Sequence, residues 1–250
     1  MIPAAYTYLL VNAACISVPL LFSFHPRLRF DLHLRSFLWS TFAVFVVFVP
    51  WDISFTALGI WGFNSTYVTG HYLLGLPWEE WAFFICIPYA CMYTYHCFTV
   101  LVPRVPGDAF FRKAAPVIAW GFVGIGLLCW GRWYTTASFT LCGIFLLLHL
   151  YRWKSTYLPR FLFTFSVLLV PFVISNGVLT GLAFWRYPVI NTDPAAIADH
   201  IVWYNNAHNL GIRLFTMPVD DIPYGLTLLL IGAMVYEQRR ARYATSSDHR

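Results

Sequence analysis

Two pairs of adjacent acidic residues interrupt a chain that is otherwise strongly apolar. Glu79 and Glu80 lie near the start of an apolar run, and Glu79 follows a proline, Pro77, by two residues. Asp220 and Asp221 open the last apolar run in the same way. An ionisable group at membrane depth costs about 2.5–3.5 kcal/mol on insertion scales, so it indicates a functional site.

Paired carboxyl groups in an apolar pocket can act as acid and base. Adjacent residues on a helix point about 100° apart, so we expect one member of each pair to face the interior and the other to support it by hydrogen bonding. Burial favours the neutral form of a carboxyl group, which can then donate a proton. Two like charges at short range raise the pKa of one group further, so that one carboxyl group can act as the acid and the other as the base. Aromatic faces stabilise a cation by about 2 kcal/mol when dry. This chemistry suits protonation of an apolar alkene, and equally a proton relay.

A simpler interpretation is that both acidic pairs only occupy the first turns of helices. Proline is well tolerated there, and the helix dipole favours a carboxylate at that end by about 0.3–1 kcal/mol. This explains one carboxylate per helix. It does not explain two matched pairs bordered by Trp, Phe and Tyr.

The composition predicts a membrane protein. Of 250 residues, 59% are hydrophobic, 20% aromatic and 11% charged, whereas soluble domains carry about 25% charged residues. The first apolar run lacks the basic region and cleavage motif of a signal peptide, so we expect it to be retained. Seven runs are candidates for membrane spans; they cover residues 3–24, 36–57, 77–102, 114–131, 135–151, 159–182 and 217–236.

The basic residues predict the orientation of these spans. Seven spans place thirteen Lys and Arg residues on one side and three, Arg132, Arg186 and Arg213, on the other. By the positive-inside rule the N-terminus is then outside and the C-terminus cytoplasmic, in the cell (inner) membrane. The net charge of +5 therefore indicates membrane orientation, and we expect no nucleic-acid partner.

The two halves of the chain resemble each other beyond the acidic pairs. The segment 49–52 corresponds to 170–176, and 59–64 corresponds to 181–185. The fold class predicted is an all-α polytopic bundle of seven transmembrane helices, in which helices 1–3 and 5–7 form two parallel repeats joined by helix 4. We expect one membrane domain, 1–250; its parts are a first repeat 1–102, a linker with helix 4 at 103–134, a second repeat 135–237 and a cytoplasmic tail 238–250.

The remaining polar and aromatic residues predict less. In the long outer loop 183–216, Ile197, Ile201, Tyr204 and His208 recur at helical spacing, which predicts an interfacial amphipathic helix. The histidine spacing there is not a common ligand spacing, so we expect no metal. The six cysteines lie in apolar runs without a C-x-x-C pair and are interpreted as buried hydrophobes. Most of the following aromatic residues are assigned to the membrane interface: Trp61, Tyr67, Tyr72, Trp130, Trp133 and Tyr134.

These motifs resemble the integral-membrane lycopene cyclase family of bacteria, archaea and fungi. The first half carries P-W-D at 50–52, W-G-F-N at 61–64 and G-L-P-W-E-E-W-A-F-F at 75–84. The second half carries N-G-V-L-T at 176–180, L-G-I-R at 210–213 and P-V-D-D at 218–221. The resemblance covers residues 1–237 and is to the form with two fused halves.

The resemblance implies lycopene β-cyclisation without a cofactor, by an intramolecular lyase or isomerase of carotenoid biosynthesis. An acid protonates the terminal double bond of an acyclic end group, the chain closes, and a base removes a proton to leave a β-ionone ring. Glu79 and Asp220 are the first choices for acid and base, with Glu80 and Asp221 as their partners. Substrate-binding candidates near the acids are Trp51, Asp52, Trp78, Trp81, Phe83, Phe84, Asn176 and Tyr224.

The implied partners are a lipophilic carotenoid such as lycopene or γ-carotene and the lipid bilayer; a second copy of the chain and other carotenoid enzymes are further candidates. The main alternative is a carotenoid end-group hydratase, a cyclase with different regiochemistry or another carotenoid-modifying membrane enzyme, since related carbocation chemistry needs similar carboxylates. A proton or solute transporter is less favoured because the acids cluster toward one face. A retinal photoreceptor needs a lysine in its last helix, but Lys113 and Lys154 lie in loops. No Asp-rich motif of a prenyltransferase is present.

Overall fold

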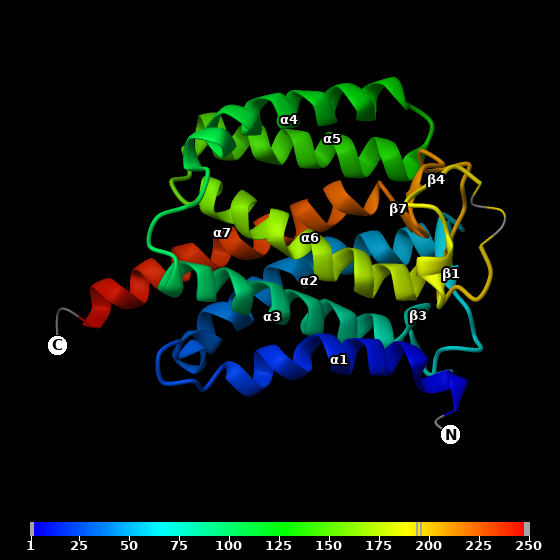
Figure 1. Ribbon diagram of the computed structural model, residues 1–250, viewed down its shortest axis with the longest axis horizontal. Helices are drawn as coiled ribbons and strands as arrows, with labels where there is room; N and C mark the ends of the chain where they lie inside the picture. The colour runs from blue at the N-terminus through cyan, green and yellow to red at the C-terminus, as the bar shows by residue number, and fades with distance from the viewer. Residues whose placement is uncertain (1–2, 194, 196, 248–250) are drawn as a thin grey trace.

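The computed structural model describes residues 3–193, 195 and 197–247, and long helices dominate it (Figure 1). Six described helices are long and apolar enough to cross a membrane. The fold is therefore the predicted all-α membrane helix bundle. The long helices are α1 (Thr7–Phe22), α2 (Leu34–Ala57), α3 (Trp78–Leu101), α4 (Asp108–Leu128), α5 (Trp133–Leu147), α6 (Leu158–Thr180) and α7 (Asp221–Ser247). Short helical turns are η1 (Ala4–Tyr6), η2 (Phe30–His33), η3 (Leu148–Arg152) and η4 (Phe184–Arg186).

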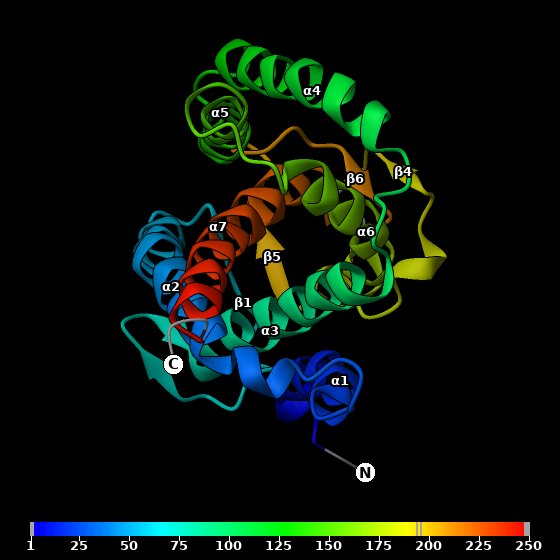
Figure 2. The ribbon, with the colours of Figure 1, turned by 90° about the vertical axis from the view of Figure 1, so that its left-hand side faces the viewer.

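The seventh helix, α7, differs from the six apolar spans because it lies in the middle of the bundle (Figure 2). Neighbouring helices cover it, so most side chains of its first four turns are buried. The helix also runs on into the polar and basic segment 237–247, which lowers its mean hydropathy. The helix continues as one element through Ser247, across the start of the segment predicted as a tail.

The fourth helix packs against α5 at the edge of the bundle (Figure 2). Glycine permits this close approach: a Cβ atom on Gly143 would lie 2.6 Å from the carbonyl oxygen of Ala119 in α4. Small residues allow helix backbones to approach closely in membrane proteins. This contact holds α4 beside the second repeat.

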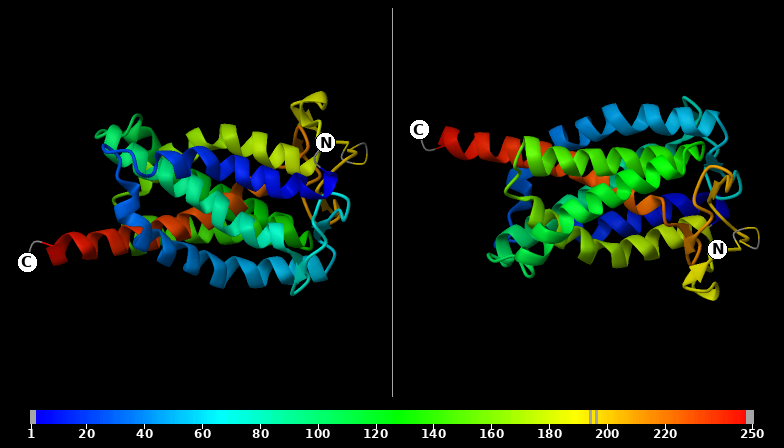
Figure 3. Two further views of the ribbon diagram at one scale, coloured as in Figure 1. Left: turned by 90° about the horizontal axis from the view of Figure 1, so that it is seen from below. Right: turned by 90° about the horizontal axis from the view of Figure 1, so that it is seen from above.

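Short strands gather at the end of the bundle that carries the N-terminus, opposite the C-terminus (Figure 3). Strands β2 and β3 form a hairpin immediately before α3, and β6 and β7 form the equivalent hairpin before α7. The strands are β1 (Trp61–Phe63), β2 (Tyr72–Leu73), β3 (Leu76–Pro77), β4 (Ile190–Asn191), β5 (Val202–Tyr204), β6 (Arg213–Leu214) and β7 (Met217–Pro218).

The outer loop does not form the predicted amphipathic helix. Residues 202–204 are strand β5, which pairs antiparallel with β1 of the first repeat. Ile201 is fully buried, and its backbone amide donates to the Leu179 carbonyl oxygen at 2.8 Å. The recurring apolar side chains therefore face protein rather than the membrane interface, and strand pairing satisfies the backbone.

A pseudo-two-fold relation connects the two outer loops. In the β1–β5 pair Gly62 lies opposite Trp203. On either side, the Asn64 amide donates to the Ile201 carbonyl oxygen and the Asn205 amide to the Ile60 carbonyl oxygen, both at 2.8 Å. The true counterpart of 61–64 is thus 202–205, and the match with 181–185 predicted from the sequence is wrong.

Candidate active site

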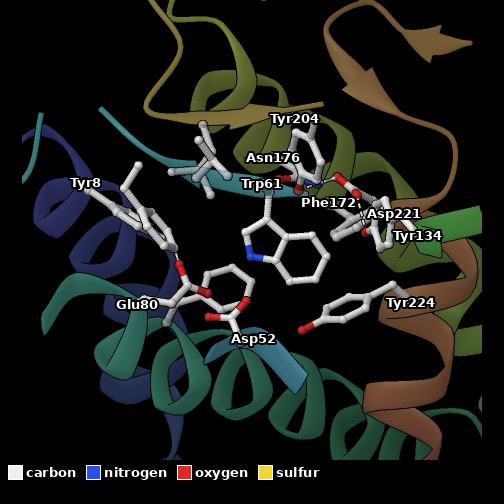
Figure 4. Close-up of a pocket in the computed structure, with 14 residues that line it drawn as sticks. Tyr8, Asp52, Trp61, Glu80, Tyr134, Phe172, Asn176, Tyr204, Asp221 and Tyr224 are labelled. Atoms are coloured by element: carbon white, nitrogen blue, oxygen red, sulfur yellow. Dashed lines mark hydrogen bonds between the residues drawn. The ribbon is translucent and has the colours of Figure 1, made fainter. Parts of the chain in front are cut away.

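A cavity lies beneath the β1–β5 pair, with side chains from both repeats on its walls (Figure 4). Six pairs of lining residues occupy equivalent positions in the two repeats: Tyr8 and Tyr134, Asp52 and Asn176, Trp61 and Val202, Phe63 and Tyr204, Glu80 and Asp221, and Phe83 and Tyr224. Phe172 and Leu179 complete the lining. The cavity therefore sits on the pseudo-two-fold axis, as expected for a site built from two repeats.

The second residue of each acidic pair reaches this cavity. Glu80, at the start of α3, accepts a hydrogen bond at 2.5 Å from the phenol of Tyr8 in α1. Asp221, at the start of α7, accepts one at 2.5 Å from the phenol of Tyr134 in α5. Both carboxyl groups are at least 93% buried. Each repeat thus presents one tyrosine-bonded carboxyl group, and the two lie on different sides of Trp61 (Figure 4).

The first repeat adds a second carboxyl group to the cavity. Asp52, from α2, lies beside Glu80, close enough for their charges to interact (Figure 4). Asp52 is 3% exposed, and its Oδ2 atom has no hydrogen-bond partner in the described structure. Two carboxyl groups at close range in a dry environment cannot both be ionised without a large electrostatic cost.

The second repeat surrounds Asp221 with donors instead. At the position equivalent to Asp52, Asn176 of α6 donates from Nδ2 to Asp221 Oδ2 at 2.6 Å. The phenol of Tyr204 donates to the same oxygen at 3.2 Å. With the Tyr134 bond, Asp221 accepts three hydrogen bonds, which favours its charged form.

The first residue of each acidic pair faces the outer loop rather than the cavity. Glu79 Oε1 accepts the backbone N–H of Thr69 at 2.8 Å. Asp220 accepts the hydroxyl of Thr135 at 2.5 Å and the backbone N–H of Leu210 at 3.3 Å. Glu79 and Asp220, the first choices from the sequence, therefore hold the loops over the cavity. One acid of each pair faces the cavity, but it is the second acid rather than the first. Within the described part of the chain, the first acids form no hydrogen bond to their neighbours and accept from the loops and from Thr135 instead.

Half of the predicted substrate-binding residues line the cavity. These are Asp52, Phe83, Asn176 and Tyr224. The other four pack elsewhere: Trp51 stacks on Phe48, Trp78 is 64% exposed and Phe84 is fully buried in the core, and Trp81 donates to the Leu73 carbonyl oxygen.

Several lining residues were not singled out for the site by their sequence pattern. Trp61 and Tyr134 were assigned to the membrane interface, but they are 5% and 2% exposed and contact each other at 5.1 Å between ring centroids. Tyr8 carries no motif that marks it in the sequence. The structure shows that the two tyrosines are equivalent: the Tyr8 amide donates to the carbonyl oxygen of Tyr67, and the Tyr134 amide donates to that of His208. Each tyrosine lies in the first turn of the first helix of its repeat. The spans predicted from the sequence begin at residues 3 and 135 and do not align these two positions.

A buried cation lies behind the second carboxyl group. Arg213 is 4% exposed and donates to the Thr216 carbonyl oxygen at 2.7 Å and to Asn206 Oδ1 at 2.8 Å. Its guanidinium lies 5.7 Å from the ring centroid of Tyr204. Burial lowers the pKa of Arg213, and the charge of Asp221 opposes this shift. Burial also raises the pKa of Tyr204 well above its usual value, so this phenol keeps the proton that it donates to Asp221.

The arrangement can exchange a proton with an apolar substrate. Two carboxyl groups from different repeats face one cavity whose other walls are mainly aromatic. Aromatic faces stabilise a cation most where water is excluded. Within the described residues, no three His, Cys, Asp or Glu side chains lie close enough together to hold a metal ion.

Comparison with known proteins identifies the family. The family model described as lycopene cyclase matches the chain twice, over residues 5–98 and 131–238. The two matched segments correspond to the two repeats and leave out the whole of α4. No significant match was found among curated proteins or among solved structures. Since the two matches cover most of the sequence and all six paired cavity positions, the chain belongs to the lycopene cyclase family.

Proposed function

We propose that this protein is a lycopene β-cyclase, which converts acyclic carotenoid end groups to β-ionone rings by acid and base catalysis without a redox step. The observation that supports this most directly is the pair of tyrosine-bonded carboxyl groups, Glu80 and Asp221, on the walls of one aromatic cavity. Isomerisation needs one group to give a proton and one to take a proton, and this cavity offers both.

The reaction balances without an added reactant. One carboxylic acid transfers its proton to the CH carbon of the terminal double bond, which leaves a tertiary carbocation. The neighbouring double bond attacks this cation, so a six-membered ring closes and the positive charge moves to the methyl-bearing ring carbon. The second carboxyl group removes a proton from the adjacent ring carbon, and the new ring double bond forms. Return of the proton from base to acid restores the enzyme, so product and substrate are isomers.

The cavity walls favour proton loss over capture of water. Trp61, Phe83 and Tyr224 present aromatic surface next to the carboxyl groups, and such faces stabilise a cation by about 2 kcal/mol when desolvated. A hydratase must instead admit and orient a water molecule at the cation. We therefore place the hydratase second. Glu79 and Asp220 are assigned to the support of the loops, to which they are hydrogen-bonded.

The membrane arrangement follows from the same proposal. The substrate is a long apolar polyene such as lycopene or γ-carotene, which dissolves in the bilayer rather than in water. We place the strand-covered end of the bundle at the outer face of the cell membrane and the C-terminus in the cytoplasm. Most Lys and Arg residues lie at the end of the bundle that carries the C-terminus, and such residues favour the cytoplasmic side.

Expression in a lycopene-accumulating host tests this proposal. The expected result is replacement of lycopene by mono- or bicyclic β-ring carotenoids, separated by chromatography, and loss of this product in a Glu80→Gln, Asp221→Asn double variant. Membranes isolated from these cells should also cyclise lycopene that is supplied in liposomes, without added NAD(P)H or flavin. Unchanged lycopene with the wild-type chain would refute the proposal, and hydroxylated acyclic end groups would replace it by the hydratase.

A further inference from the structure

The two repeats present different chemistry at equivalent positions of the cavity. The position next to the cavity carboxyl group is Asp52 in the first repeat and Asn176 in the second. The strand position is Phe63 in the first repeat and Tyr204 in the second, where the phenol donates to the carboxylate. The fold is pseudo-symmetric, but the environments of the two carboxyl groups are not equivalent.

The first-repeat environment retains a proton. Glu80 faces Asp52, and none of the described residues that line this cavity is Lys or Arg. Among the described residues, the phenol of Tyr8 is the single side-chain hydrogen-bond donor to the Glu80 carboxyl group. Two neighbouring buried carboxyl groups share one proton because like charges at short range cannot both ionise. This pair can therefore hold a neutral carboxylic acid at the start of each turnover.

The second-repeat environment retains a negative charge. Asp221 accepts from Tyr134, Asn176 and Tyr204, and the buried guanidinium of Arg213 lies behind the Tyr204 ring. At the position equivalent to Arg213 in the hairpin of the first repeat stands Tyr72, which is 49% exposed. Three donors and a buried cation stabilise a carboxylate that is ready to accept a proton.

We propose that the two repeats have separate catalytic roles: the Asp52–Glu80 pair supplies the proton, and Asp221 removes it. Asp52 acts as a positioning residue that keeps the proton on Glu80, and Asn176 is the positioning residue that keeps Asp221 charged. This inference rests on the proposed cyclase function and adds the direction of proton flow, from the first repeat to the second.

Isotope incorporation separates the two roles. Membranes with each variant are incubated with lycopene in D2O, and the carotenoids are analysed by mass spectrometry. The wild type should introduce one deuterium per ring, at the carbon protonated first. Glu80→Gln should leave lycopene unlabelled. Asp221→Asn should still protonate the substrate. Deuterium should then appear in ring isomers, in hydrated products, or in lycopene in which the protonated carbon has kept the deuterium and lost its original hydrogen.

A second pair of variants exchanges only the neighbouring groups. Asp52→Asn makes the first repeat resemble the second, because an amide then donates to Glu80 and stabilises its charged form. Label incorporation should fall at least tenfold at neutral pH and recover as the pH is lowered. The titratable or charged groups facing Glu80 are Asp52 from α2, Tyr8 from α1, Tyr204 from β5 and Tyr224 from α7. The three phenols remain in this variant, so the pH response reports the loss of Asp52.

Asn176→Asp makes the opposite change in the second repeat. A second carboxyl group beside Asp221 should hold a proton there, so this variant should give the labelled side products of Asp221→Asn. It changes one amide to a carboxyl group of almost the same shape, which makes it a matched control for Asp52→Asn. If Asp221→Asn fails to accumulate in the membrane, Asn176→Asp decides the question.

The wild-type sample tests the cyclase proposal by itself, and the variants test the division of roles only where the wild type is active. With an active wild type, labelled products from Glu80→Gln together with unlabelled lycopene from Asp221→Asn would reverse the assignment. Unlabelled lycopene from both Asp221→Asn and Asn176→Asp would overturn the division of roles. An unchanged pH response in Asp52→Asn would refute the shared proton.

Discussion

Glu79→Gln and Glu80→Gln make the same chemical change at neighbouring residues, and the structure predicts opposite consequences. Glu79 is 1% exposed, and its Oε1 atom accepts the Thr69 amide at 2.8 Å. Its Oε2 atom is buried without a partner. In Glu79→Gln the amide oxygen can still accept from Thr69, but the NH2 group takes the place of Oε2 and has no acceptor there.

An unsatisfied buried donor of this kind costs about 1–3 kcal/mol. For a chain of this length, 1 kcal/mol corresponds to about 2–4 °C in melting temperature, so the variant should melt about 2–12 °C below the wild type. The folded protein should keep its turnover within a few-fold. In Glu80→Gln the group that transfers the proton is lost, and general acid catalysis contributes about 10²–10⁴-fold, so turnover should fall by at least 10²-fold.

Both variants can be measured in the same detergent-solubilised preparation, with thermal unfolding for stability and chromatography of carotenoids for turnover per folded molecule. Glu79→Asp is a useful third variant, because it keeps the carboxyl group but shortens the reach to the Thr69 amide and should lose stability only. The reasoning would be wrong if Glu79→Gln were fully folded and inactive while Glu80→Gln remained active. That result would make Glu79 the acid, as the sequence alone suggested.

Three further variants examine the walls and the frame of the cavity. Tyr134→Phe removes the 2.5 Å hydrogen bond to Asp221; a hydrogen bond to a charged group contributes about 1.5–3 kcal/mol, so kcat/KM should fall about tenfold or more, and an unchanged value would contradict the role of this phenol. Gly62→Val introduces side-chain atoms where the Trp203 ring already lies; overpacking costs about 1–3 kcal/mol, so both melting temperature and turnover should decrease, and a wild-type melting curve would refute the contact. Gly143→Leu should push α4 away from α5 and lower the melting temperature, while the folded fraction keeps its turnover because α4 does not line the cavity; selective loss of turnover would show that α4 does contribute.

The bundle and the acidic pairs could be predicted from the sequence because both depend on strong local signals. Long apolar runs must be helical in a bilayer, where every backbone polar group needs an internal partner. A carboxyl pair after Pro77 or Pro218 is conspicuous in such a run. The member of each pair that faces inward could not be predicted, because it depends on the rotation of the helix. In this fold the loop between β1 and β2 helps to fix that rotation, because the Thr69 amide in this loop donates a hydrogen bond to Glu79.

The strand pairing and the tyrosines were missed for a different reason. Strands of two or three residues are too short for their alternating pattern to be recognised, and β1 finds its partner far along the chain in β5. The outer loops also differ in length between the repeats. The separation in sequence between Tyr8 and Glu80 therefore differs from that between Tyr134 and Asp221. Only contacts across the pseudo-two-fold axis show that these four residues correspond.

The opposition of Gly62 and Trp203 also determines which halves can recognise each other. Antiparallel strands related by a two-fold axis place the same position opposite itself when two identical halves meet. Two first repeats would then bring glycine against glycine and leave the space of an indole ring empty, and two second repeats would force two indole rings into the space of one. One half of each kind fills that space once, since the Trp203 ring lies where a Gly62 side chain would be. The strand pair therefore favours the unlike combination, so halves expressed as separate chains should assemble one to one.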